Sequence, residues 1–370
     1  MKKILIGYLI LLSITSFAKD LSDGLLAYAG GKYPEAFKII KEYATAGDKN
    51  AQYMLADMYL NGLGTKKDLE QGFINYSKSA IQGHIKAQYE LGNLYAIGIH
   101  VKKDYSEAYK WYKLSADKGN IDAMLQVALS KHLGFGTEID HVEENIWLIL
   151  AAESGLTDAT YLLGYNLING DGTKANFDEG VKHLKAAADK DFVKAQELLG
   201  DIYYEGKLTP KNKEAALIWY SKAATNGSIE SAKVASRIYG TDKKYQLSFK
   251  YAKLAADKGD SVSQTIVGVY YNSGEGVMQD FSEAIKWFRL AAKQNDYYAQ
   301  LTLGKMYWVG RGATKNLVKA YAWTNISSAE GGQESVEVRN EIAKELSPKQ
   351  IVEAQIFSRE CIKRNFDGCD

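Results

Sequence analysis

The sequence predicts an all-α protein, a right-handed α-solenoid of stacked helix-turn-helix repeats. One pattern of small, apolar and glycine residues recurs along the chain with a period of about 36 residues. A period of this length is typical of solenoids, in which each unit buries its apolar face only against its neighbours. With three prolines and 46% hydrophobic residues, the composition fits a continuous folded array. The eight repeats are expected at residues 51–86, 87–122, 123–158, 159–194, 195–230, 231–262, 263–298 and 299–334.

The first 50 residues are expected to comprise a signal peptide and a capping hairpin. Two lysines are followed by a short apolar run and by Ser16-Phe17-Ala18. This order is typical of a secretory signal peptide over residues 1–18, with cleavage after Ala18. The location is then periplasmic or secreted. An uncleaved anchor is the alternative, and the shortness of the apolar run for a spanning helix argues against it. Residues 19–50 are expected to form a tetratricopeptide-like hairpin that caps the array.

The first helix of each repeat carries a large apolar residue followed by a small one, as in Leu163-Gly164. Only a small side chain lets two helices approach closely at that height. An aromatic residue three positions later lies on the same helical face. Lys131 and Leu167 interrupt this aromatic column, so the third and fourth repeats are expected to pack differently. Glycines end the helix because they adopt positive φ readily.

The second helix of each repeat is expected to start after an Asp or Asn whose side chain accepts a backbone N–H. These N-caps are Asp68, Asp104, Asp140, Asn176, Asn212, Asp280 and Asn316. In five repeats a Gln or Glu stands three residues later, which predicts reciprocal capping boxes. Those residues are Gln71, Glu107, Glu143, Glu179 and Glu283.

The end of the chain departs from the repeat. Residues 335–370 are expected to form capping helices, with Ser347 as an N-cap and Pro348 at the first helical position. The cysteines are Cys361 and Cys369. In an exported protein this pair predicts one disulfide. Two free thiols or two metal ligands are the alternatives.

Two stretches, Ala-Gln-Tyr-Glu-Leu-Gly-Asn-Leu-Tyr at 87–95 and Glu-Ala-Ile-Lys-Trp-Phe-Arg-Leu-Ala-Ala at 283–292, are distinctive. On these the chain resembles the Sel1-like repeat family, relatives of the tetratricopeptide repeat, over residues 51–334. The resemblance implies a scaffold acting in envelope maintenance, adaptor assembly, or host interaction and virulence. The sixth repeat departs from the pattern, because it has 32 residues and its glycine turn is reduced to Gly240-Thr241-Asp242.

The residues offer little evidence for catalysis or for a cofactor. The histidines occupy unrelated columns and form no His-x-x-x-His pair, so no metal site is expected. Ser115 and Lys118 match the Ser-x-x-Lys motif of serine β-lactamases, and some Sel1-like proteins have been described as weak penicillin-binding proteins. Ser115, however, occupies a column of small residues, and the partner motifs are missing. We therefore expect no enzyme, with a penicillin-binding protein or weak β-lactamase as the alternative.

A binding groove is the better candidate for function. The first helices of tetratricopeptide-like stacks line the concave face, and the third, seventh and tenth residues of each repeat are expected to point into it. His132 occupies one of these columns. The candidate contact residues are Tyr53, Tyr89, Tyr161, Tyr165, Asp201, Tyr204, Arg237, Lys305 and Trp308. Tyr, Trp and Arg are enriched at binding hot spots. The alternative is that some of these tyrosines pack sideways between adjacent first helices.

The partner is expected to be a protein or peptide. Loss of residues 1–18 removes two lysines and no acidic residue, so the net charge changes from +1 to −1. A nearly neutral chain has no electrostatic basis for binding nucleic acid. We expect a monomer without an integral membrane segment after cleavage. A regulator of a peptidoglycan-processing enzyme is the alternative scaffold role.

Overall fold

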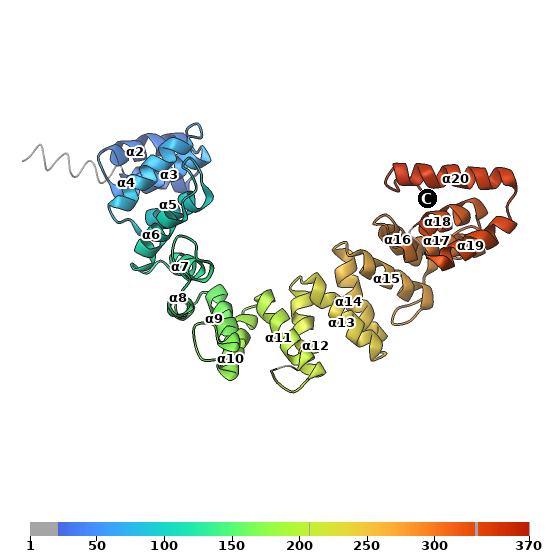
Figure 1. The fold of residues 1–370 in the computed structure, drawn as a ribbon. Coiled ribbons are helices and arrows are strands. Elements are labelled where there is room, and N and C mark those ends of the chain that lie inside the picture. The colour runs from blue at the N-terminus through green and yellow to red at the C-terminus, as the bar shows by residue number, and fades with distance from the viewer. Residues whose placement is uncertain (1–20, 207, 330–331, 370) are drawn as a thin grey trace, which may run out of the picture. The chain divides into compact units, whose positions relative to one another are not determined.

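A computed structural model describes residues 21–206, 208–329 and 332–369, and confirms the all-α repeat fold (Figure 1). The signal-peptide prediction falls on residues outside this described part. Residues 21–29 are helical. The helices that follow are α2 (Tyr33–Thr45), α3 (Lys49–Asn61), α4 (Leu69–Ile81), α5 (Ile85–Ile97), α6 (Tyr105–Ala116), α7 (Ile121–Leu133), α8 (His141–Glu153), α9 (Thr157–Asn169), α10 (Phe177–Ala188), α11 (Val193–Glu205), α12 (Lys213–Thr225), α13 (Ile229–Thr241), α14 (Tyr245–Asp257), α15 (Ser261–Ser273), α16 (Phe281–Ala292), α17 (Tyr297–Val309), α18 (Leu317–Ala329), α19 (Gln333–Lys344) and α20 (Pro348–Lys363).

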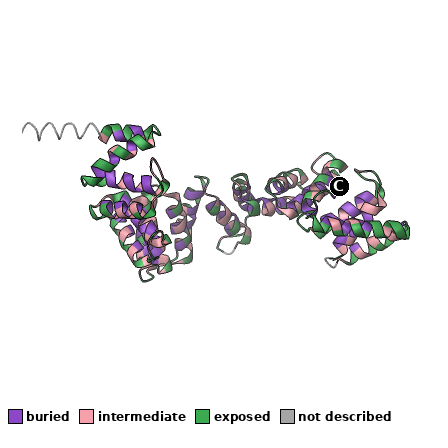
Figure 2. Ribbon diagram, turned by 90° about the horizontal axis from the view of Figure 1, so that it is seen from above, coloured by how far each residue is buried: buried purple, intermediate pink, exposed green. Residues whose placement is uncertain are grey.

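The chain divides into two compact units, which meet in sequence between Ala187 and Ala188, at the end of α10. In both units each first helix packs on the second helix of its own repeat, as α3 does on α4 and α15 on α16. Within each unit a second helix also packs on the first helix of the following repeat, as α4 does on α5 and α14 on α15. Buried and exposed residues consequently alternate along the helices (Figure 2).

The column of small residues forms the contact between the two helices of a repeat. A Cβ added to Gly92 would lie 2.6 Å from the ring of Tyr112. In the fourth repeat two glycines meet, and a Cβ on Gly164 would lie 2.9 Å from the carbonyl oxygen of Gly180. At Gly164 the α9–α10 contact is therefore largely with backbone, whereas a Cβ on Gly180 would first meet the Ile168 side chain, at 2.6 Å.

The predicted N-caps of the second helices are all present as hydrogen bonds, for example Gln71 N to Asp68 Oδ1 at 3.0 Å. The expected capping boxes are wrong for α4, α6, α8 and α16, where the structure has the cap without the reciprocal contact. The N-cap N–H is already used: it donates to the carbonyl nine residues earlier, as Asp104 does to Tyr95 at 3.0 Å. The glutamates pair with lysines instead, as Glu107 does with Lys110.

Buried glutamines fasten consecutive repeats together. The Nε2 atom of Gln88 donates to the carbonyl of Ala80 at 3.1 Å, and Gln300 does the same to Ala292 at 3.2 Å. Both side chains are almost fully buried. Each bond reaches from the start of a first helix to the end of the preceding second helix. The turn between repeats is thus closed by a hydrogen bond shielded from water.

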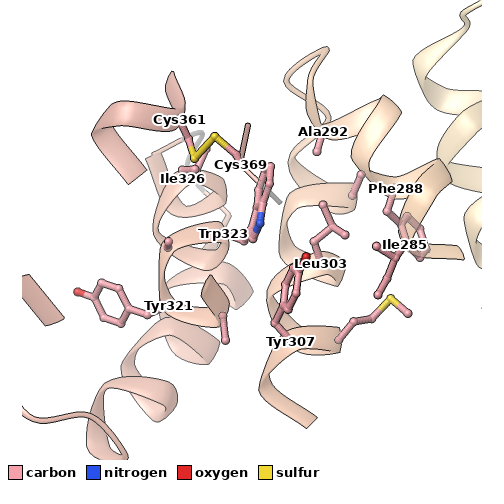
Figure 3. Close-up of a cluster of buried hydrophobic side chains, with 14 of the residues drawn as sticks. Ile285, Phe288, Ala292, Leu303, Tyr307, Tyr321, Trp323, Ile326, Cys361 and Cys369 are labelled. Carbon is pink, nitrogen blue, oxygen red and sulfur yellow. A yellow bond between two sulfur atoms is a disulfide. The ribbon is translucent and has the colours of Figure 1, made fainter. Parts of the chain in front are cut away.

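The C-terminal capping helices cover the last repeat. Helix α20 packs on α18, and its N-cap Ser347 forms a complete capping box with Gln350. Cys361 and Cys369 are joined in a disulfide with their Cα atoms 5.6 Å apart. The disulfide lies beside Trp323, the largest side chain of the apolar cluster here (Figure 3). Trp323 is 2% exposed and its ring stacks on Phe366.

Candidate functional site

The first-helix face is the surface formed by the third, seventh and tenth residues of the repeats. Its third position reaches sideways to the start of the next first helix. The ring of Tyr53 stacks on His84 with centroids 4.7 Å apart, and Ser228 donates to Glu197 at 2.5 Å. Burial raises the pKa of Tyr53. Tyr53 therefore packs sideways against the next first helix, which is the alternative to groove exposure.

The remaining tyrosines differ in how much of the ring is free. Tyr89 is half-buried against Tyr112, with ring centroids 5.9 Å apart. Tyr161 is also half-buried, whereas Tyr165 is 42% exposed. Tyr204 is half-buried, and the ammonium of Lys211 lies 4.8 Å from its ring centroid. Among these four, Tyr165 offers the most surface to a partner.

The seventh position contacts the second helix of its own repeat in several units. Tyr220 donates a hydrogen bond of 2.7 Å to Asp201, as Tyr112 does to Asn93 at 2.9 Å. Asp201 as a residue is exposed, yet protein atoms crowding its carboxylate raise its pKa, an effect that the Tyr220 hydroxyl partly offsets. Asp201 is therefore engaged within the repeat as well as facing solvent.

A pocket of about 430 Å³ opens on the first-helix face between α13 and α15. Lys233, Arg237 and Gly240 line it from α13, and these are the three predicted face positions of the sixth repeat. Lys233 is paired with Glu230 and Asp260, at 3.1 and 3.6 Å. Arg237 is exposed and forms no ion pair with any residue that the structure describes.

A second pocket of about 400 Å³ lies between α15 and α17 on the same face. Its lining includes Asn272, Tyr298, Lys305, Trp308 and Arg311. Lys305 pairs with Glu334 at 2.5 Å, and Trp308 donates to Glu345 at 2.7 Å, so α19 and the residue after it hold both side chains. The bond from Trp308 is the main reason that the pKa of Glu345 is lowered. The basic and aromatic residues of the last repeats thus share one pocket.

Ser115 does not have the surroundings of a nucleophile. It is fully buried, and its hydroxyl donates to the carbonyl of Ile85 at 2.8 Å. Lys118 reaches a different group, the carbonyl of Gly83 at 3.2 Å. Ser79 makes the same bond as Ser115 one repeat earlier, to Lys49 at 2.7 Å. The Ser-x-x-Lys spacing here corresponds to a recurring structural hydrogen bond.

Two histidines from unrelated columns nevertheless come together in the third repeat. His132, at the end of α7, and His141, at the start of α8, both face the carboxylate of Glu144. Their Nδ1 atoms lie 3.0 and 2.7 Å from its Oε2. We refer to these three residues as the His–Glu cluster.

A signal for the His–Glu cluster was present in the alignment of the repeats, although single motifs did not show it. Glu144 stands in a column that holds only glycine or alanine in the other 36-residue repeats: Gly72, Ala108, Gly180, Ala216, Ala284 and Ala320. His141 stands in a column that is aromatic or apolar in most of these repeats, as at Tyr105 and Phe281, with Lys213 as another exception. Reading each column for its exceptions would have found both residues.

Comparison with known proteins gives the family. The Sel1 repeat model matches residues 49–84, 85–120, 157–192, 193–228, 236–260, 261–296 and 298–332. The chain therefore belongs to the Sel1 repeat family. The matched segments leave out residues 121–156, the repeat that carries the His–Glu cluster. No curated protein matches the chain.

Solved structures agree with this assignment. A protective antigen of uropathogenic Escherichia coli, described as displaying an SLR fold, is 26% identical with a TM-score of 0.61. The match covers 95% of this chain and 78% of the antigen. A Sel1 repeat protein from Oxalobacter formigenes is 31% identical with a TM-score of 0.58, over 64% of this chain and 98% of that protein. Within the described residues, no helix is both long and apolar enough to traverse a bilayer.

Proposed function

We propose that this protein is an exported scaffold that binds a protein or peptide partner through the first-helix face. The observation that carries the proposal is the pair of pockets between α13, α15 and α17. Both are lined by positions that the repeat pattern assigns to this face. Sel1 and tetratricopeptide-like repeats generally mediate protein interactions, which supports the same reading.

The chemistry of the two pockets favours a partner segment that bears a carboxylate and a large apolar side chain. Arg237 is exposed without an ion-pair partner in the described chain, so it can bind a carboxylate in a bidentate manner without first losing a bond. Trp308 and Tyr298 supply aromatic surface of the kind found at hot spots. An extended acidic peptide could occupy both pockets in turn.

A crosslinking capture from the native envelope and from culture medium tests the proposal. Wild-type protein is compared with Arg237→Ala and with Lys286→Ala, a change on the second helix α16, where Lys286 pairs with Glu283. We expect Arg237→Ala to weaken partner binding at least tenfold, because removing a hot-spot side chain costs about 2 kcal/mol or more. A partner that tolerates Arg237→Ala but is lost with Lys286→Ala would place the binding surface on the second helices instead.

Export is the second part of the proposal. It is supported by the signal-like residues 1–18, by the disulfide at the C-terminus, and by a related structure described as a protective antigen. The role would then lie in envelope maintenance or host interaction. The intact mass of the native protein tests this: we expect a chain that begins at Lys19 and contains one disulfide. The mass of residues 1–370 with two free thiols would contradict both points.

A further inference from the structure

We propose that the His–Glu cluster, formed by His132, His141 and Glu144, is a binding site for Zn²⁺. The ligand atoms of the three side chains, one per residue, all lie within 4.8 Å of one another. They come from the last turn of α7 and the first turn of α8, so the short loop between these helices would be closed by the ion. This site is independent of the pockets proposed to bind a partner.

The geometry requires little rearrangement to accept an ion. Nδ1 of His132 and Nδ1 of His141 are 3.0 and 2.7 Å from Oε2 of Glu144. Ligand atoms around tetrahedral zinc, with bonds near 2.0–2.1 Å, stand about 3.3 Å apart. The two nitrogen–oxygen distances would lengthen by about 0.3 and 0.6 Å, and the ligand nitrogens of the two histidines, which lie within 4.8 Å of each other, would settle at a similar separation. Without metal, both imidazoles must donate from Nδ1, because an ionised carboxylate only accepts. A shift of each proton to Nε2 frees both Nδ1 lone pairs for the ion.

Glu144 is held in position by a second layer of polar side chains. Its Oε1 atom accepts a 2.8 Å bond from Asn166 Nδ2, which also donates to Asn145 Oδ1 at 2.9 Å. Asn145 in turn donates to the carbonyl of Asp171 at 2.6 Å. Glu144 is 3% exposed and Asn166 1% exposed. A network of this kind orients a metal-binding carboxylate. Its Oε2 atom faces both histidines, and Nδ1 of His132 also lies 3.1 Å from Oε1.

The ligand chemistry of the site favours zinc. The C-terminal end of α7 attracts a cation and the N-terminal end of α8 repels one, so the two helix dipoles largely offset each other. Two imidazoles and one carboxylate suit Zn²⁺, whereas Mg²⁺ and Ca²⁺ prefer oxygen ligands throughout. The histidine side chains are 41% and 40% exposed, so a fourth position is open to water.

The repeat pattern argues that the cluster is more than a way of filling the core. A glycine or alanine occupies the Glu144 column in the other 36-residue repeats, and they fold without a carboxylate there. Burying a carboxylate costs free energy that its partners must offset. Among the 36-residue repeats of this chain the carboxylate is therefore specific to the third. That repeat also lies outside the segments that match the family model.

Equilibrium dialysis of untagged, disulfide-intact protein against Zn²⁺, with metal counted by mass spectrometry, tests the proposal. We expect one Zn²⁺ per chain, undiminished by excess Mg²⁺ or Ca²⁺, and a visible absorption band typical of low coordination number when Co²⁺ replaces Zn²⁺. His132→Gln and His141→Gln should each weaken zinc binding at least tenfold. His100→Gln is the matched control, because His100 is an exposed histidine outside the cluster. That variant should bind as wild type does.

Circular dichroism of each variant separates loss of a ligand from loss of fold. Both cluster histidines are partly exposed, so their glutamine variants should keep the wild-type spectrum. Asn166→Ala, which removes a positioning residue, should weaken zinc binding about 10- to 100-fold in folded protein. The proposal is overturned if wild-type protein takes up no zinc at micromolar concentration. It is equally overturned if both folded histidine variants bind as tightly as His100→Gln.

Discussion

The third and eighth repeats place different chemistry on equivalent positions of one helix pair. In the third repeat, Glu144 and Asn145 lie between α7, α8 and α9 and are hydrogen-bonded to Asn166. The corresponding residues of the eighth repeat are Ala320 and Tyr321, which belong to the apolar cluster with Trp323 (Figure 3). Both pairs nevertheless have 13-residue helices and the same Asp or Asn cap before the second helix.

The difference teaches that the repeat fixes the backbone frame more strictly than it fixes the polarity of the core. A polar core is tolerated where every group has a partner, since a buried polar group is costly only when unpaired. Lys131 illustrates the same rule. It replaces the aromatic residue of its column, is buried, and pairs with Glu143 at 2.8 Å, a bond that raises its pKa. The third repeat was expected to pack differently at this column. The difference is that an ion pair between Lys131 and Glu143 takes the place of an aromatic contact.

Exchanging the two residues that distinguish these repeats should give the largest effect. Ala320→Glu places a carboxylate at a fully buried site in the apolar cluster, where no partner waits. We expect a loss of about 3–5 kcal/mol in the free energy of unfolding, because an uncompensated buried charge costs that much. Glu144→Ala should cost less, about 1–3 kcal/mol, since Asn166 keeps its bond to Asn145.

Urea denaturation followed by circular dichroism, with hydrogen exchange to locate the damage, measures both changes. If the two variants lost equal stability, there would be no difference between a site that accommodates a carboxylate and one that does not. The same conclusion would follow if Ala320→Glu had the same urea midpoint of unfolding as the wild type.

Gly164→Leu tests the frame itself. Its side chain would start 2.9 Å from the carbonyl of Gly180 and 3.1 Å from the Cβ of His183. Because the obstacle includes backbone, we expect a loss near the upper end of the range for overpacking, about 3 kcal/mol. A solenoid also transmits the damage to adjoining repeats. A thermal melt identical to that of the wild type would show that the helices of the fourth repeat can separate freely.

Cys369→Ser tests how much the apolar cluster of the last repeat relies on its covalent closure. The disulfide joins residues eight apart and buries both cysteines beside Trp323. Closure of so short a loop should contribute about 2–3 kcal/mol. We expect the variant to melt at a lower temperature than oxidised wild-type protein, and reducing agent should bring the wild type to the temperature of the variant. An unaffected melt would mean that α20 stays docked by its apolar contacts alone.

The smallest expected effect concerns His84, which caps α5 through its Nδ1 atom in a regular repeat. Burial, and then Lys49 and Lys86, lower its pKa below the ordinary value of 6.5. The neutral ring is the form that accepts the bond from Ala87, so this contribution is present in full above about pH 6.5. It is lost as the pH falls below that value, because the unfolded chain then binds the proton more readily.

His84→Asn should remove this pH dependence while keeping the cap, since asparagine accepts the same bond without titrating. Between pH 7.5 and pH 5 we expect the wild type to lose more stability than the variant, measured by thermal melts at both pH values. Parallel losses in the two proteins would mean that protonation does not disturb this helix start.

The sequence alone predicts the frame, because the frame depends on local chemistry repeated in register. The caps at Asp68 and its equivalents and the small residues such as Gly164 each act within one repeat. Prediction fails where residues of two columns can accept a hydrogen bond from the same N–H group. The capping boxes do not form because the N–H of Asp104 is taken by the Tyr95 carbonyl, a contact that only the folded turn creates.

The candidate site was less predictable than the frame. The face positions were assigned by column. A column does not determine whether a side chain is free for a partner or packs against a neighbouring helix. Tyr53 turns to His84, whereas Tyr165 faces solvent. The two histidines of the cluster are nine residues apart on different helices, so their meeting depends on the turn between α7 and α8.

The shortened turn between α13 and α14 has a consequence for how such proteins diversify. The sixth repeat lacks the usual paired glycines, yet Ser236 and Ser248 still join its helices by reciprocal hydrogen bonds of 2.9 and 2.7 Å. Both serines line the pocket that opens there. A deletion in this turn therefore leaves the register of the array intact while reshaping its surface. Turn length is thus an evolutionary variable separable from helix sequence, and an engineer could graft or trim it to alter specificity one repeat at a time.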